Sequence, residues 1–237
     1  MIFITGDTHG DQERLSKTEL SMIKSDDTLI ICGDFGFIWN NDSKEAQFLN
    51  RLEKRNYTIC FVDGIHENFN VLNNYPVVIW NGGRVHKIRN NIFHLMRGQI
   101  YEIENKKFFT MGGGENPELD LQEEDDLSEH KEIPSTSEML NGVSNLEKHN
   151  YKVDYIITHE PPSKIRDFLL LSSNKTLRVT TLGAYLDELS QQTDFKRWYF
   201  AGMHIDKFIS DSYTAIFRNI VSIEGIEQKK KFSLKRK

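Results

Sequence analysis

Aspartate and histidine side chains recur in the sequence where short apolar runs end. Each lies within a few residues of a run of apolar, largely β-branched residues. The six are Asp7, His9, Asp34, His66, His159 and His204. Carboxylates and neutral imidazoles are common protein ligands of divalent metals such as Mn²⁺, Fe²⁺ and Zn²⁺. Many loops contain one Asp-x-His pair by chance, so the information lies in the repeated position of these residues.

The apolar runs that precede these residues predict strands buried on both faces. The runs are Ile2–Ile4, Leu29–Cys32, Thr58–Val62, Tyr155–Ile157 and Trp198–Ala201. Continuous apolar runs of about four to eight residues, bounded by turn residues, are typical of such strands. In parallel sheets, ligands bind at the carboxyl ends of the strands. The six polar side chains are therefore expected to converge on one shared site.

Segments of helical length separate the first three predicted strands. Gln12–Lys24 is one, and Ser43–Lys54 is another, with its apolar residues at helix-like spacing. This alternation predicts βαβ units. Two further helices are expected over Gly142–Lys152 and Leu182–Gln191, the second preceded by Thr180-Thr181 as capping residues.

The middle of the chain has a different pattern. Four short segments, separated by two to five residues, predict an antiparallel meander. They are Arg84–Ile88, Asn91–Leu95, Gln99–Ile103 and Lys107–Met111. Glu115–Asp126 then contains seven acidic residues, and we interpret it as a surface loop. That loop is either a solvated linker or a lid over the strand ends.

The length and composition predict one folded domain. The 237 residues are 38% apolar and 27% charged, which excludes collagen-like, low-complexity and wholly disordered chains. We expect a domain over residues 1–227 and a disordered basic tail over residues 228–237. The net charge is −5, but the tail has six basic and no acidic residues, so the body has 24 basic and 35 acidic residues, a balance of −11. An acidic body argues against a broad nucleic-acid-binding surface, leaving the tail as the only expected contact with nucleic acid.

Cysteine usage and hydropathy predict a cytoplasmic protein. Cys32 and Cys60 lie in apolar runs, form no CxxC motif and are expected to be buried, reduced thiols. No stretch approaches the ~18–20 apolar residues that a membrane span requires, so no membrane partner is expected. The first ten residues, MIFITGDTHG, become polar too early for a signal peptide.

The order and spacing of the polar motifs resemble those of the calcineurin-like metallophosphoesterases, of the compact bacterial or phage type. The family motifs are D-x-H, G-D, G-N-H-D/E, a later H, and G-H-x-H. The matching residues are Asp7-Thr8-His9, Gly33-Asp34, Gly64-Ile65-His66-Glu67, His159 and Gly202-Met203-His204. The resemblance runs from Ile2 to about Ile223. It implies an α/β fold, a four-layer α/β/β/α sandwich with mixed sheets.

The resemblance also implies a role for each matching residue. The implied ligands are Asp7, His9, Asp34 and His204 for a first metal ion, with Asp34 and His159 for a second. Two such ions hold phosphate oxygens and supply a hydroxide for in-line attack, with Asp34 bridging them. His66 would stabilise the pentavalent phosphorus and protonate the leaving oxygen. Glu67 would act as a structural partner behind these groups.

Two departures from the family pattern fall on the second metal position. The family's Asn is Ile65, whose side chain has no donor atom, and the first His of G-H-x-H is Gly202. All four residues that match the first ion's ligands are retained. We therefore predict one firmly bound ion, Mn²⁺, Fe²⁺ or Zn²⁺, and a second position that is weak or empty.

The sequence favours a metal-dependent phosphoesterase whose substrate is a small phosphomonoester or phosphodiester, or a nucleotide. The alternative is a pseudoenzyme that binds a nucleotide or a protein partner on the same scaffold. The arginine-bearing G-D-x-x-D-R-G motif is absent, which disfavours a dedicated protein phosphatase. Arg97 is expected either to contact a substrate phosphate or to form a salt bridge at the surface. His86 and His94 are expected to be surface or packing residues rather than replacement ligands.

Overall fold

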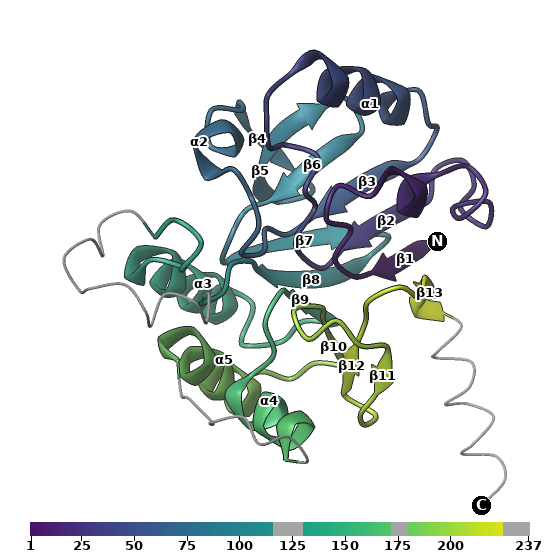
Figure 1. Cartoon of the computed structure of the whole chain (residues 1–237). Helices are drawn as coiled ribbons and strands as arrows, with labels where there is room; N and C mark the ends of the chain where they lie inside the picture. The colour runs from purple at the N-terminus through teal and green to yellow at the C-terminus, as the bar shows by residue number, and fades with distance from the viewer. Residues whose placement is uncertain (116–129, 172–179, 225–237) are drawn as a thin grey trace, which may run out of the picture.

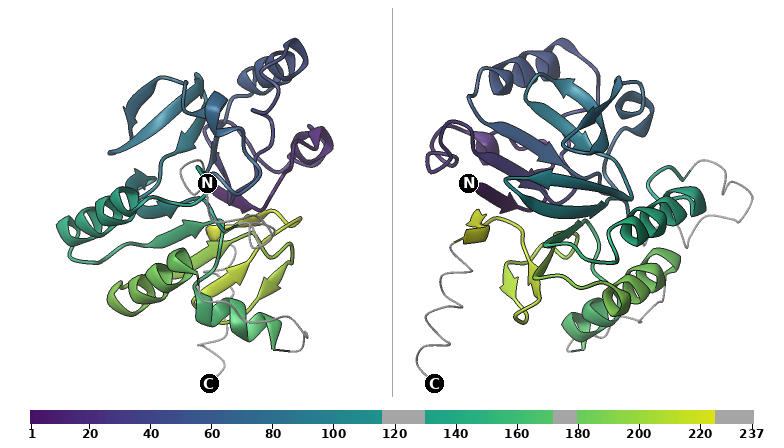
Figure 2. Two further views of the ribbon diagram at one scale, coloured as in Figure 1. Left: turned by 60° about the vertical axis from the view of Figure 1, so that its left-hand side comes forward. Right: turned by 180° about the vertical axis from the view of Figure 1, so that it is seen from behind.

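Two mixed β-sheets pack face to face, and helices cover both outer faces (Figures 1 and 2). This computed structural model describes residues 1–115, 130–171 and 180–224. The architecture is the expected four-layer α/β/β/α sandwich. Nearly all of the acidic segment, and the whole basic tail, lie outside the described residues. The division into residues 1–227 and 228–237 therefore stays a prediction.

The first sheet has seven strands in the order β13-β1-β2-β3-β6-β5-β4. Its four central strands, β1, β2, β3 and β6, run parallel, and β13, β5 and β4 pair antiparallel at the two sides. The bounds are β1 Ile2–Thr5, β2 Thr28–Ile31, β3 Thr58–Phe61, β4 Val77–Trp80, β5 Gly83–Arg89, β6 Ile92–Leu95 and β13 Val221–Ser222. The β1, β2 and β3 strands are close to those that the apolar runs predict.

The second sheet has six strands in the order β11-β12-β10-β9-β8-β7. The inner strands β8, β9, β10 and β12 run parallel, and β7 and β11 pair antiparallel at the edges. The bounds are β7 Gln99–Ile103, β8 Lys106–Met111, β9 Tyr155–Thr158, β10 Arg197–Phe200, β11 Lys207–Phe208 and β12 Tyr213–Ala215. The predicted meander is therefore split: β5 and β6 belong to the first sheet, and β7 and β8 to the second. Gly98, at φ 68°, lies in the short connection that carries the chain between them.

The first sheet is covered by α1 (Ser43–Glu53), α2 (Phe69–Leu72) and a 3-10 helix (Gln12–Leu15). The sequence predicts a full helix over 12–24, and this prediction is wrong. Ser16 ends the 3-10 helix in an extended conformation, and its Oγ then accepts a hydrogen bond from the Glu19 N–H at 3.2 Å. Serine side chains compete for backbone groups in this way and favour turns over helix interiors.

The second sheet is covered by α3 (Thr136–Lys148), α4 (Ser163–Leu170) and α5 (Thr181–Gln192). The α3 helix begins earlier than its apolar pattern indicates, because Ser135 and Glu138 form a reciprocal capping box. Thr180 caps α5 by accepting a hydrogen bond from the Gly183 N–H.

Three apolar clusters fill the spaces between the four layers. One lies between the two sheets and contains Cys60 and Tyr155. The second, around Phe48 of α1, fills the outer face of the first sheet, and the third, around Leu186 of α5, fills the outer face of the second. Both cysteines are buried and free, as predicted. None of the described helices is long and apolar enough to cross a membrane.

Candidate metal centre

The carboxyl ends of five parallel strands, drawn from both sheets, carry the polar residues that the sequence singles out. Asp7, Asp34 and His66 follow β1, β2 and β3, which are neighbours in the first sheet. His159 and His204 follow β9 and β10, which are neighbours in the second. The topology therefore brings residues nearly 200 positions apart to one edge of the sandwich.

Four of these side chains form one compact group of possible metal ligands. One ligand atom from each of Asp7, His9, Asp34 and His204 lies within 4.8 Å of all the others. The His204 Nε2 atom is 3.1 Å from Asp7 Oδ2 and 3.1 Å from His9 Nε2, and His9 Nδ1 is 3.6 Å from Asp34 Oδ2. Both carboxylates are buried and both imidazoles are exposed, so the group opens to solvent on its histidine side.

The backbone at this group is held in conformations that residues other than glycine rarely adopt. His9, Asp34 and His204 have φ angles of 48°, 40° and 52°. Such left-handed conformations cost about 1–3 kcal/mol and persist where the surrounding structure enforces them. Here the Thr8 and His9 N–H groups both donate to the Asp34 carbonyl, at 3.0 and 2.8 Å. The loops after β1 and β2 are thereby locked together, which fixes the spacing of the two carboxylates.

Both carboxylates of this group favour the ionised form, which is the form that binds a cation. Burial alone would raise the pKa of Asp7, but His159 and His204 beside its oxygens hold that pKa well below its usual range. Burial likewise opposes ionisation of Asp34, and contact with His66 lowers its pKa nonetheless. Neither Asp7 oxygen accepts a well-aligned hydrogen bond from any described residue. Two ionised oxygens and two imidazole nitrogens are a donor set that suits a divalent transition metal.

His66 lies directly against this group without belonging to it. Its Nδ1 is 2.8 Å from Asp34 Oδ2, and its backbone N–H donates to Asp34 Oδ1 at 2.8 Å. Since Asp34 is ionised, it accepts the hydrogen bond and Nδ1 donates, which leaves Nε2 pointing away from Asp34. The His66 side chain is 55% exposed, so Nε2 is available to a ligand at the centre.

His159 is placed differently from the other expected ligands. It is buried, and its Nδ1 lies 3.3 Å from Oδ1 of Asp7, one of the four possible ligands described above. Burial alone would lower the pKa of His159, but Asp7 raises it to about 10. A Cβ at Gly202 would lie 3.1 Å from His159 Nε2, so the imidazole occupies the space beside that glycine.

The chain matches the calcineurin-like phosphoesterase family over residues 1–206. It belongs to that family. Among solved structures, phosphopantetheinyl hydrolase (PptH) from Mycobacterium tuberculosis is similar to it, with 14% identity and a TM-score of 0.46. That match covers 97% of this chain and 92% of the hydrolase. No curated protein matches the chain.

The G-D motif of this phosphoesterase-family chain shows why a glycine precedes Asp34. Gly33 has a φ of 125°, and an added Cβ would lie 2.1 Å from His159 Nδ1. The family residue Glu67 supports the same loop from behind. Its buried carboxylate accepts a 2.6 Å hydrogen bond from the Phe35 N–H, one residue after Asp34. The loops that carry Asp34 and His66 are thus fastened to each other, in line with the structural role expected for Glu67.

Replacing Gly33 with alanine is expected to destabilise the fold and displace His159. The left-handed conformation alone should lower the free energy of unfolding by about 1–3 kcal/mol, and the contact with His159 adds to that loss. Gly82→Ala is the matched control, because Gly82 also has a positive φ (91°) but its Cβ would meet nothing closer than 3.9 Å. Urea denaturation of both variants gives the comparison. Equal losses of stability would show that the contact with His159 contributes nothing.

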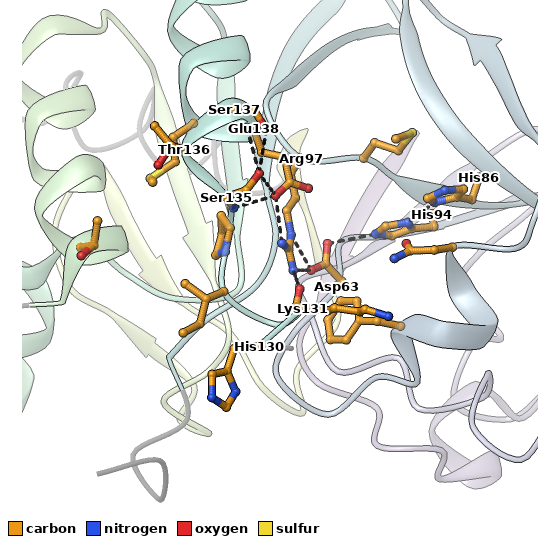
Figure 3. A pocket seen from close by; sticks show the side chains of 17 residues that line it. Asp63, His86, His94, Arg97, His130, Lys131, Ser135, Thr136, Ser137 and Glu138 are labelled. Atoms are coloured by element: carbon orange, nitrogen blue, oxygen red, sulfur yellow. Dashed lines mark hydrogen bonds and ion pairs between the residues drawn. The ribbon is translucent and has the colours of Figure 1, made fainter. Parts of the chain in front are cut away.

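Arg97 forms a salt bridge and not a phosphate contact, but the pair is buried and does not lie at the surface as expected (Figure 3). Its Nε and Nη2 donate to Asp63 Oδ2 at 2.9 and 2.6 Å, and its Nη1 donates to Glu138 at 3.2 Å. Nη2 also reaches the carbonyls of Lys131 and Glu132. Protein acceptors thus occupy every nitrogen of this buried guanidinium, and we assign no substrate phosphate to it.

The Arg97–Asp63 pair continues into the two histidines of the middle strands. His94 Nε2 is 3.0 Å from Asp63 Oδ1, and His86 Nδ1 is 2.9 Å from His94 Nδ1 (Figure 3). Both histidines are buried, as packing residues and not as part of the metal group. Sequence reasoning missed Asp63, although an acidic residue at the end of an apolar strand is a signal that a buried cation lies nearby.

Proposed function

We propose that the chain is a metal-dependent phosphoesterase with one firmly held ion at Asp7, His9, Asp34 and His204. The observation that supports this most is that these four side chains and His66 come together from the ends of four strands at one solvent-open edge. Mn²⁺ is the ion we propose to test first, beside Fe²⁺ and Zn²⁺. An ion bound there would neutralise phosphate oxygens and acidify a water molecule for attack on phosphorus.

Side chains of the protein would orient the general acid, donate the proton and hold the ion. Asp34 fixes the orientation of the His66 ring through Nδ1, which directs Nε2 toward the open side of the centre. His66 would protonate the leaving oxygen as the P–O bond breaks, which is general acid catalysis. Asp7 would anchor the ion deepest, since it is fully buried and has two oxygens without well-aligned hydrogen bonds among the described residues.

The alternative is a binding protein on the same scaffold, and Ile65 and Gly202 favour it. Neither residue supplies a ligand atom for a second ion, and the described residues contain no metal-ligand group other than the one above. Hydrolysis of p-nitrophenyl phosphate and bis-p-nitrophenyl phosphate with added Mn²⁺ separates the two functions. Turnover that depends on the metal supports the enzyme. Absence of turnover at every metal concentration, together with retained nucleotide binding, would support the binder.

Restoring the family residues should strengthen the second metal position. The double variant Ile65→Asn/Gly202→His is expected to bind a second ion and to raise kcat by at least about tenfold, a typical effect of altered metal surroundings. The His159 ring must move by a few tenths of an ångström to admit the new side chain. Metal content and kcat measured together check this. Ile65→Leu/Gly202→His is the control, because leucine offers no donor atom at position 65. A double variant with two bound ions and unchanged kcat would show that the missing ligands do not limit activity.

A further inference from the structure

A small pocket adjoins the loops that carry Asp34 and His66. Its volume is about 330 Å³, near the lower end of the range for small-molecule sites, and leaves room for one ring system. Its wall includes Glu67 and Asn68, the two residues that directly follow His66. A larger pocket of about 750 Å³ shares the Lys131 and Phe69 walls and is shown in Figure 3. Of the two pockets, only the small one has Glu67 and Asn68, the residues after His66, in its wall.

The most prominent group in the small pocket is the indole of Trp39. It is 47% exposed, although it is a large aromatic side chain. Its backbone is nevertheless fixed: the Trp39 carbonyl accepts a 2.6 Å hydrogen bond from Asn68 Nδ2, and its N–H donates to the Glu45 carboxylate at 3.1 Å. An aromatic ring on an immobilised loop can stack on a planar ligand with little further loss of backbone entropy.

Polar groups stand on another wall of the same pocket. Lys131 Nζ donates to Asn70 Oδ1 at 2.5 Å, which places an ammonium and an amide beside each other. Together with the indole, these groups match a heteroaromatic ring that carries hydrogen-bond acceptors on its edge. Nucleobases have this chemistry, and stacking on aromatic side chains tolerates any of them.

We propose that this pocket binds the base of a nucleotide substrate, with Trp39 stacked on the face of the ring. The proposal rests on the proposed function, because the phosphate ester would then lie at the metal centre. Asn68, two residues after His66, binds the backbone of Trp39, so the general acid and the stacking ring belong to one connected loop pair. The nucleoside is the leaving group that His66 would protonate, and it would extend into the neighbouring pocket.

Two substrates that differ only in the base test this directly. The ratio of kcat/KM for adenosine 5′-phosphate to that for ribose 5-phosphate is expected to be about tenfold or more, a typical value for base stacking. Trp39→Ala should bring that ratio close to one, and Trp39→Phe should keep most of it. Phe208→Ala, which removes another exposed aromatic ring (57% exposed), should leave the ratio at the wild-type value. If only diesters are cleaved, 2′,3′-cyclic AMP and the base-free cyclic phosphate of ribose replace the two monoesters.

A ratio that stays the same in Trp39→Ala, or a wild-type ratio near one, would overturn the proposal. If no substrate is cleaved, the proposed function has failed and the pocket is judged by binding alone. Titration with adenosine 5′-phosphate should then quench tryptophan fluorescence in the wild type and not in Trp39→Phe. Absence of quenching in the wild type would overturn the pocket assignment as well.

Discussion

Replacing His66 with alanine is expected to reduce kcat by about 10²–10⁴, the range that general acid catalysis contributes. The metal content should remain that of the wild type, because His66 contacts Asp34 but lies outside the group of four proposed ligands. The loss should be largest for substrates with alkoxide leaving groups. It should be much smaller for p-nitrophenyl esters, because p-nitrophenolate leaves without a proton.

The dependence on the leaving group distinguishes proton donation from a structural role. Steady-state kinetics with both kinds of ester, and metal analysis of the same preparations, give the comparison. His149→Ala is a suitable control, since the His149 side chain, at the C-terminal cap of α3, bonds only to the Asn145 carbonyl among the described residues. Equal losses with both kinds of leaving group, or loss of the metal, would contradict the assignment of His66 as the acid.

Replacing Arg97 with methionine is expected to lower the free energy of unfolding by about 3–5 kcal/mol, the usual cost of removing one partner from a buried ion pair. Asp63 is fully buried and, among the described residues, would keep only His94 as a polar side-chain partner. Burial alone would raise the pKa of Asp63, and Arg97 is the main group that holds it well below its usual range. Chemical denaturation at pH 7 measures the loss.

The pH dependence has a definite sign. In the wild type, Asp63 has a lowered pKa, so its contribution to stability is present above the unfolded pKa of about 3.9 and is lost as the pH falls. In Arg97→Met the carboxylate has lost its main counter-charge and can take up a proton. The difference in stability between the two proteins should therefore shrink between pH 7 and pH 4.

A second variant keeps this prediction testable if Arg97→Met folds poorly. Asp63→Leu/Arg97→Met removes both charges and should be more stable than Arg97→Met alone, because no buried charge is left unpaired. A single variant as stable as the wild type, or a double variant less stable than the single, would show that an unpaired Asp63 is not what destabilises Arg97→Met.

Local sequence patterns predict the individual strands of this fold better than they predict which strands pair with each other. The runs around β1, β2 and β3 are continuous and β-branched, which determines both their type and their ends. Which strands pair is not local information: β6 lies beside β3, although β4 and β5 separate them in sequence. The local pattern therefore predicts one continuous meander, whereas the connection at Gly98 carries the chain from the first sheet to the second.

In the candidate site, too, local motifs predict some features, and others depend on long-range packing. The order of the Asp and His motifs was enough to predict which side chains would meet, because parallel strands place their carboxyl ends together. Two contacts depend on packing between distant segments. One joins His159 to Asp7, and the other joins Arg97 to Asp63, which are separated by 34 residues in the sequence. No spacing in the sequence encodes those contacts.

Metal stoichiometry tests the account most directly. After removal of bound metal, the protein should be titrated with Mn²⁺, dialysed and assayed for metal per chain by mass spectrometry. We expect one equivalent in the wild type, near zero in Asp7→Asn, and one equivalent in the control Asp26→Asn, which alters an exposed carboxylate. Two full equivalents in the wild type, or one equivalent retained in Asp7→Asn, would contradict a single ion held by Asp7, His9, Asp34 and His204.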